Sequence, residues 1–216
     1  MTNVQWPRYT FTAPIVRDLM AIEAARQMVR LTTLPPALAE RLRTQARLRS
    51  THFSTRIEGN RLTLAEAQAA VLGGQRFPGR TRDVHEVQNY YRALQQVEEW
   101  AERQTVITED LIRKLHALIF TGPRARPTPY RDGQNAIRDA ASGAIVYLPP
   151  EAADVPPLMA DLVGWIVQAE HDQTPAPVVA GLAHYQFVTI HPFYDGNGRT
   201  ARALATLLLY RQGYDL

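Results

Sequence analysis

One stretch near the C-terminal end decides the fold of this chain: His191-Pro192-Phe193-Tyr194-Asp195-Gly196-Asn197-Gly198-Arg199-Thr200-Ala201-Arg202. Pro192 disfavours helical geometry for the residue before it, so a helix should end near Ile190 or His191. The Gly-Asn-Gly turn gives the backbone freedom, and successive amides in such a turn can form an anion-binding nest. A helix that begins at Asn197 adds the positive end of its dipole. The stretch therefore predicts two helices joined by an anion-binding loop.

Charged side chains in this stretch indicate which anion binds. Arg199 and Arg202 are three residues apart in the first turn of a helix, so they share a face. Cations are disfavoured at a helix N-terminus unless an anion lies among them, and a polyphosphate fits this position. Asp195 beside the nest is a candidate ligand for Mg²⁺, which prefers oxygen ligands and bridges phosphates. His191 would follow a helix C-terminus, where the partial negative charge favours an imidazolium, so the ring is a candidate proton acceptor.

Two other interpretations compete with a polyphosphate site. A His-Pro pair or a Gly-Asn-Gly turn alone is usually only a turn. His184, one heptad before His191, also suggests a hydrolytic metal site together with Asp195, but Pro192 and Gly196 interrupt the helix that would align these ligands. The joint occurrence of all these residues within twelve positions favours the polyphosphate.

The composition is that of an ordinary globular protein. The 216 residues are 45% apolar and 21% charged, with a net charge of +3 and no cysteine, which excludes disulfides and thiolate metal sites. Basic and acidic residues are interspersed, so nucleic-acid binding by this segment is not indicated. No apolar run approaches the roughly 20 residues of a membrane span, and residues 1–7 do not resemble a signal peptide. We therefore expect a cytoplasmic protein without a membrane segment.

Most of the remaining chain is predicted to be helical from apolar spacing and capping residues. Thr63 and Glu66 have the capping-box form, and Thr108 precedes two acidic residues as a second N-cap. Residues 122–150 are rich in Pro, Arg and Gly and predict a small hairpin over about 135–147. Helices are expected over about residues 14–30, 36–59, 64–72, 82–102, 109–119, 152–170, 177–190 and 197–213.

The stretch 191–202 resembles the signature of the Fic family, HPFx(D/E)GNGRxxR, and matches it at every defined position. The resemblance implies a mainly α Fic-fold helical bundle with a short β-hairpin flap near the active site. It divides the chain into an N-terminal helical region, residues 1–107, and a Fic core domain, residues 108–216. The implied activity is transfer of AMP from ATP to a Ser, Thr or Tyr hydroxyl of a target protein. Related kinases replace the second glycine with lysine, so Gly198 favours nucleotidyl transfer.

The resemblance also implies a role for each residue of the signature. His191 would be the general base and Asp195 the Mg²⁺ ligand. The phosphates would be bound by Gly196, Asn197, Gly198, Arg199 and Arg202. The hairpin at about 135–147 would be a flap that docks the target in extended form, a mode that reads backbone more than side chain.

A second carboxylate far from the signature matches another family pattern. Glu58 precedes Gly59-Asn60, a predicted helix stop, so its charge lies at the negative end of a helix. Pairing with Arg202, a cation at a helix N-terminus, would relieve both charges. Ser54, one turn earlier, is expected to hydrogen-bond the Glu58 carboxylate or the backbone. The string Ser54–Gly59 resembles the inhibitory pattern (S/T)xxxE(G/N). The resemblance implies an inhibitory helix over about 36–59 whose Glu58 occupies the space of the ATP γ-phosphate and lets ATP bind only in an unproductive pose.

Several alternatives stay open at this stage. Glu58 is also suited to orient a water that removes AMP from a target, which would make the protein a Mg-dependent de-AMPylase. The chain stops at Leu216, directly after a helix, which leaves open a nucleotide-sensing regulator with a further DNA-binding domain. The family resemblance allows a homodimer. The target, the base preference and the trigger that releases Glu58 are not indicated by the sequence.

Overall fold

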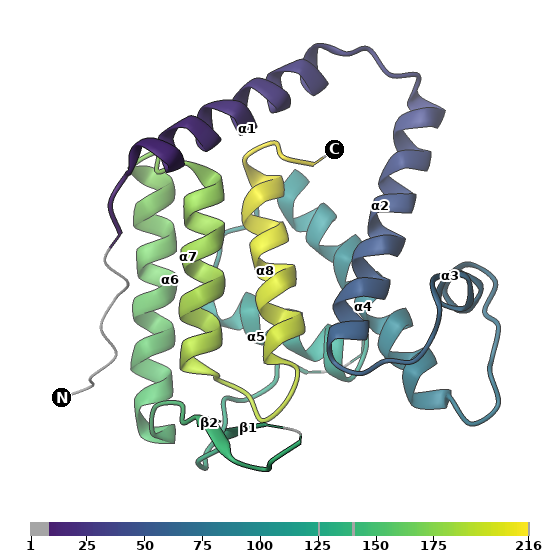
Figure 1. The fold of residues 1–216 in the computed structure, drawn as a ribbon, viewed down its shortest axis with the longest axis vertical. Coiled ribbons are helices and arrows are strands. Elements are labelled where there is room, and N and C mark those ends of the chain that lie inside the picture. Colours follow the sequence, from purple (N-terminus) through teal and green to yellow (C-terminus); the bar gives the residue numbers. More distant parts are fainter. Residues whose placement is uncertain (1–8, 125, 140, 216) are drawn as a thin grey trace.

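The structure is a computed structural model that describes residues 9–124, 126–139 and 141–215. Within these residues the chain forms eight α-helices, one 3₁₀ turn and one two-stranded hairpin (Figure 1). The predicted mainly helical fold with a small hairpin is thereby confirmed. The N-terminal residues in which no signal peptide is expected, residue 140 of the predicted hairpin and Leu216 lie outside the described residues.

Helix α8 (Asn197–Arg211) lies at the centre of a bundle. It packs against α7 (Ala176–Ile190), α4 (Thr81–Glu102) and α5 (Glu109–Phe120), and α6 (Val155–His171) packs on α7 (Figure 1). Burial of each large core side chain contributes about 1.5–3 kcal/mol to stability. The packing therefore holds the ends of α7 and α8, and with them the signature loop. Fully buried side chains of this core include Leu162, Ile166, Phe187, Ile190, Leu204 and Leu207.

Helix α2 (Pro36–Ile57) packs on α4 and α8 through its C-terminal half only. Arg47 anchors this half, because its Nε donates to Glu98 Oε1 at 2.8 Å and its Nη1 donates to the Tyr91 hydroxyl at 3.0 Å. The buried side chains of α2 lie between Arg47 and Thr55. The helix therefore carries its last turn to the N-terminus of α8.

Both predicted N-caps are present. Thr63 and Glu66 form the capping box of α3 (Leu64–Leu72), with Glu66 N donating to Thr63 Oγ1 at 3.2 Å and Thr63 N donating to Glu66 Oε2 at 2.8 Å. Thr108 caps α5 by accepting from Leu111 N at 3.1 Å. These bonds satisfy amides that a helix start leaves free, so both helices begin where the sequence predicts.

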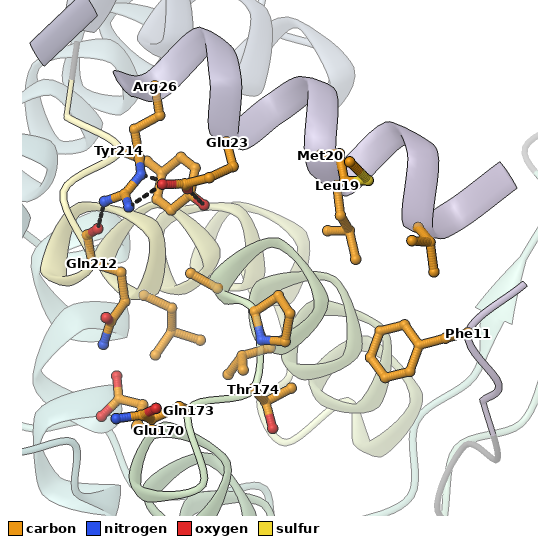
Figure 2. A pocket seen from close by; sticks show the side chains of 15 residues that line it. Phe11, Leu19, Met20, Glu23, Arg26, Glu170, Gln173, Thr174, Gln212 and Tyr214 are labelled. Carbon is orange, nitrogen blue, oxygen red and sulfur yellow. Dashed lines mark hydrogen bonds and ion pairs between the residues drawn. The ribbon is translucent and has the colours of Figure 1, made fainter. Parts of the chain in front are cut away.

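Helix α1 (Ala13–Leu31) buries none of its residues. Arg26 Nη1 donates to Gln212 O at 2.9 Å, and the Tyr214 hydroxyl donates to Glu23 at 3.2 Å, which fixes the helix near the C-terminal end of α8. Between α1 and the ends of α6, α7 and α8 lies a cavity of about 660 Å³ (Figure 2). It opens near the N-terminus of α7, away from the loop at its C-terminus. The apolar spacing predicted this helix, but its apolar side chains remain largely exposed.

The predicted hairpin is present but short. Strands β1 (Ile137–Arg138) and β2 (Ile145–Tyr147) pair antiparallel, with Ile137 opposite Tyr147 and Arg138 opposite Ile145. The side chain of Asp139 accepts from Ser142 N at 2.7 Å and closes the turn. Both strands are largely exposed, and the hairpin lies near the α7–α8 loop (Figure 1). A 3₁₀ turn (Ala152–Asp154) then leads into α6.

The helices agree with the predicted ranges within a few residues at each end, the normal uncertainty of helix boundaries. In the described part of the chain, no helix has the length and apolar character that crossing a membrane requires.

Candidate active site

The loop between α7 and α8 takes its shape from the sequence of the signature. α7 ends at Ile190, as Pro192 predicts, and His191 is its C-cap in the left-handed region, with φ 53° and ψ 59°. Gly196 also has a positive φ, 77°, directly before α8 begins. The left-handed conformation costs a non-glycine residue about 1–3 kcal/mol, so the surroundings of His191 must hold it there.

Asn197 closes this loop. Its Oδ1 accepts from Phe193 N at 2.9 Å and its Nδ2 donates to Phe193 O at 2.7 Å, and the side chain is buried. The Asn197 side chain therefore shapes the loop, and the predicted part of this residue in phosphate binding stays a prediction.

The free backbone amides of the nest begin at Asn197. Gly196 N donates to Asp195 Oδ1 at 2.5 Å, so this amide is occupied. The amides of Asn197, Gly198 and Arg199 have no hydrogen-bond partner among the described residues, because they form the first turn of α8. This turn offers three donors and the positive end of the α8 dipole to an anion.

His116 on α5 contacts the α7–α8 loop at Phe193 and Asp195 and was not predicted as a site residue. Its Nε2 lies 2.8 Å from Asp195 O and its Nδ1 lies 2.9 Å from Thr128 Oγ1. Since a carbonyl only accepts, Nε2 carries the proton and Nδ1 accepts from the hydroxyl. The ring stacks on Phe193 with centroids 3.8 Å apart. Burial lowers the pKa of His116, which keeps the ring neutral.

His191 is suited to act as a base because it is buried, and not because of the helix C-terminus as expected from the sequence. Burial lowers its pKa, and the charge of Arg131 lowers it further, while a hydrogen bond to Val188 O acts in the opposite direction. Desolvation thus outweighs the helix C-terminus, and the expectation that an imidazolium is favoured was wrong. Nδ1 lies 3.3 Å from Val188 O. With the proton on Nδ1, the lone pair of Nε2 is available to accept a proton.

Arg131 joins His191 to the base of the hairpin. This side chain is 3% exposed and donates through Nε to His191 O at 2.9 Å, and its own amide donates to Pro192 O at 2.9 Å. Nη1 donates to Gly133 O at 3.0 Å, and Nη2 donates to Pro150 O. The acceptors are neutral oxygens from three segments of chain. No local sequence signal marks this arginine, because its partners in the α7–α8 loop and at Pro150 are distant along the chain.

Arg199 lies between two carboxylates. The side chain is 3% exposed, with Nη2 at 3.5 Å from Asp195 Oδ1 and Nη1 at 3.4 Å from Glu86 Oε1 on α4. Asp195 is more open, with 54% of its side chain exposed. The Nε of Arg199 is buried without a hydrogen-bond partner among the described residues. Glu86 was not predicted as a site residue.

Glu58 and Arg202 form the predicted ion pair. Arg202 Nη2 donates to Glu58 Oε1 at 2.7 Å, with both side chains partly exposed. Arg202 Nε donates to Ser54 Oγ at 2.8 Å, and Arg202 Nη2 donates to Ser54 O at 3.0 Å. Ser54 was expected to bond to the Glu58 carboxylate or the backbone, but its hydroxyl binds Arg202 instead.

The Glu58 carboxylate lies directly over the first turn of α8. A Cβ placed on Gly198 would approach Glu58 Oε1 to 2.5 Å, so any larger residue at this position would require the carboxylate to shift. Negative charge from α2 thus lies beside the unoccupied amides, where a phosphate would compete with it.

The hydrolytic metal alternative finds no support in this geometry. Within residues 9–124, 126–139 and 141–215, no group of three or more His, Cys, Asp or Glu side chains is arranged to hold a metal ion. The loop brings together His191, Asp195 and the first turn of α8, and Glu58 comes from α2. His184 lies on α7, and burial together with the charge of Arg202 lowers the pKa of this histidine.

Comparison with solved structures identifies the class to which this fold belongs. A Fic domain-containing signaling protein from Bacteroides thetaiotaomicron superposes with a TM-score of 0.78, at 26% identity, over 92% of this chain and 73% of that chain. A Fic family protein from Desulfovibrio desulfuricans superposes with a TM-score of 0.75, at 34% identity, over 94% of this chain and 59% of that chain. The helical bundle with its signature loop and hairpin is thus a Fic fold.

The family model described as Fic/DOC family matches residues 106–209, and this chain belongs to that family. Two similar relatives are each called Protein adenylyltransferase Fic, from Drosophila erecta and Drosophila melanogaster. Each is 30% identical over 200 residues, which are 92% of this chain and 39% of the relative. The chain therefore spans less than half the length of these relatives.

Proposed function

We propose that this protein is an adenylyltransferase that transfers AMP from ATP to a Ser, Thr or Tyr hydroxyl of a target protein. The observation that carries the proposal is the α7–α8 loop, where a neutral imidazole follows α7 and three free amides begin α8. The names of the relatives support the same activity. The Fic core is proposed to be residues 108–216, with residues 1–107 as its regulatory region.

In the proposed reaction, the target hydroxyl oxygen attacks the α-phosphorus of ATP. The bond from that phosphorus to the bridging oxygen breaks, and pyrophosphate leaves. His191 Nε2 accepts the proton of the hydroxyl, and the first-turn amides of α8 stabilise the charge on the α-phosphate. Arg199 and Arg202 are placed to bind the distal phosphates through charge-assisted hydrogen bonds.

The residues fit a Mg²⁺ ion at Asp195. This carboxylate is half exposed, and its Oδ2 has no hydrogen-bond partner among the described residues. Mg²⁺ is commonly held in proteins by one or two carboxylates together with substrate phosphates, so one carboxylate suffices here. When bound, the ion would neutralise charge on the phosphates, and Asp195 would hold it.

We further propose that Glu58 keeps the resting enzyme inhibited. The 2.7 Å pair with Arg202 removes a phosphate ligand, and the carboxylate beside Gly198 repels a polyphosphate. The hairpin at about 135–147 is proposed to dock the target as an added strand, since β1 and β2 are exposed beside the loop. The cytoplasmic location and the homodimer remain predictions from the sequence.

Auto-modification with labelled ATP tests this function. Glu58→Gly should raise the signal, since it frees Arg202 and removes a negative charge from the nest. Glu58→Gly combined with His191→Ala should lose it, while Glu58→Gly with His171→Ala, an exposed histidine, should keep it. Equal signals from wild type, Glu58→Gly and the His191 variant would overturn the proposal.

De-AMPylation is a second candidate, because the Glu58 carboxylate lies beside the free amides and could orient a water. Removal of AMP from a modified target would then be lost in Glu58→Gly, whereas inhibition predicts a gain of transfer in that variant. A nucleotide-sensing regulator with a DNA-binding domain beyond Leu216 remains a third hypothesis, and the gene sequence after this position tests it.

A further inference from the structure

Glu86 on α4 contacts both the inhibitory segment and the phosphate-binding segment. Its side chain is 13% exposed. One oxygen, Oε2, accepts from Asn60 Nδ2 at 3.0 Å, and the other, Oε1, pairs with Arg199 Nη1 at 3.4 Å. Oε1 also accepts from Arg82 Nε at 3.2 Å, a neighbour that is itself largely exposed.

On the inhibitory side, Asn60 determines where the chain leaves α2. The backbone N–H of Asn60 donates to Thr55 O at 3.1 Å. In the buried side chain, Nδ2 donates to Asp83 O at 2.9 Å as well as to Glu86. Only Gly59, with φ 91°, separates Asn60 from Glu58. The anchor at Asn60 therefore restricts the position of the Glu58 carboxylate over Gly198.

On the phosphate side, Arg199 is held loosely. Its two ion pairs, with Glu86 and Asp195, are 3.4 and 3.5 Å long, and its buried Nε has no hydrogen-bond partner among the described residues. A buried donor without a partner is costly, so the group is suited to an acceptor supplied by a ligand. Glu86 keeps the guanidinium beside the first turn of α8 until that acceptor arrives.

We propose that Glu86 is a positioning residue that acts on both sides, holding Asn60 so that Glu58 inhibits and holding Arg199 so that it can bind ATP phosphate. The inference rests on the proposed nucleotidyl transfer. It implies that one carboxylate supports both the inhibited state and the active state. Removal of Glu86 should therefore weaken inhibition in the wild type and weaken ATP binding in a variant that is already released.

The phosphate side is tested in the Glu58→Gly background, where no inhibition remains to be lost. Adding Glu86→Gln, which keeps the shape and removes the charge, should raise the KM for ATP about fivefold and change kcat by less than about twofold. Glu102→Gln, the same change at an exposed position of α4, is the control, and Asn60→Ala should leave this KM unchanged. An unchanged KM for ATP in the Glu86→Gln variant would overturn the proposal that Glu86 positions Arg199 for ATP binding.

The inhibitory side is tested with Glu58 present and at saturating ATP, where a higher KM no longer matters. Inhibition persists at this concentration because Arg202 stays paired with Glu58 and ATP binds in an unproductive pose. Asn60→Ala and Glu86→Ala should each raise auto-modification about threefold, and the double variant should rise no further than the larger single effect, because both break one link. Additive increases, or no increase in Glu86→Ala, would contradict the proposal that Glu86 acts on Glu58 through Asn60. Thermal unfolding of each variant identifies any loss of folding, and the Gln variant then repeats the test.

The experiments distinguish failure of the proposed nucleotidyl transfer from failure of the proposed role of Glu86. If Glu58→Gly shows no transfer, or if transfer survives the loss of His191, the proposed function is wrong and the inference falls with it. If Glu58→Gly is active and depends on His191 but is insensitive to Glu86, only the inference is wrong.

Discussion

At the scale of single residues, the site depends on side chains that hold the backbone as much as on those that would touch ATP. Arg131 is the clearest example, since its side chain and backbone amide bind oxygens at the start of the α7–α8 loop and at the base of the hairpin. It keeps His191 in a strained conformation and fixes the hairpin beside it.

Arg131→Ala should therefore affect both stability and transfer. The buried oxygens left without a donor should lower the free energy of unfolding by about 3 kcal/mol. In the Glu58→Gly background, kcat should fall more than the affinity for ATP, because the loop amides remain on α8. Urea denaturation and steady-state kinetics measure these effects. Arg92→Ala, a change at an exposed arginine of α4 outside the site and the hairpin, should change neither, and a variant of Arg131 that resembles it would contradict the assignment.

The pH dependence of transfer follows from the lowered pKa of His191, which burial and the charge of Arg131 produce. A general base works in its neutral form, so the rate should rise with pH as the ring loses its proton. Because the pKa is lowered, this rise should be centred below the ordinary value of 6.5. The kcat/KM of Glu58→Gly, measured from about pH 5 to 8, tests this prediction. A midpoint above 6.5 would contradict it.

At the scale of elements, α2 places the inhibitory carboxylate through its C-terminal half alone. Arg47 pairs with Glu98 and bonds to Tyr91 on α4, and it is buried. Its removal leaves an uncompensated carboxylate and loosens the helix that carries Glu58.

Arg47→Ala should lower the free energy of unfolding by about 3 kcal/mol and should raise auto-modification, because a loosened α2 places Glu58 less often over Gly198. Thermal unfolding and labelling with ATP measure the two effects. Arg41→Ala, an exposed arginine on the same helix, is the control. Lower stability without any increase in transfer would mean that the last turn of α2 is held independently of Arg47.

The elements show what sequence can predict. Helix starts at Thr63 and Thr108 and the helix end before Pro192 were predictable, because capping and proline act within a few residues. The pairing of Glu58 with Arg202 was predictable from two charges at unfavourable helix ends and from the family pattern. Arg131, His116 and Glu86 were missed because their partners come from other elements. The protonation preference of His191 was wrong because burial, which a sequence does not display, outweighs the helix end.

At the scale of the whole molecule, the chain is a packed bundle with one helix laid across it. Helix α1 buries no residue, and a cavity of about 660 Å³ separates much of it from the ends of α6, α7 and α8 (Figure 2). The bond from Arg26 to Gln212 O and the bond from the Tyr214 hydroxyl to Glu23 hold it at one end. Helical stability in proteins comes mainly from packing, so α1 should open independently of the bundle.

Amide hydrogen exchange tests this independence. Amides of α1 should exchange at least about 100-fold faster than those of α7, which is buried in the bundle, because local opening requires far less free energy than global unfolding. Arg26→Ala should speed exchange in α1 further and leave α7 unchanged, since it removes the ion pair with Glu23 and the bond to Gln212 O. Arg30→Ala, exposed on the same helix, is the matched control. Protection of α1 equal to that of α7 would contradict the prediction that this helix opens independently of the bundle.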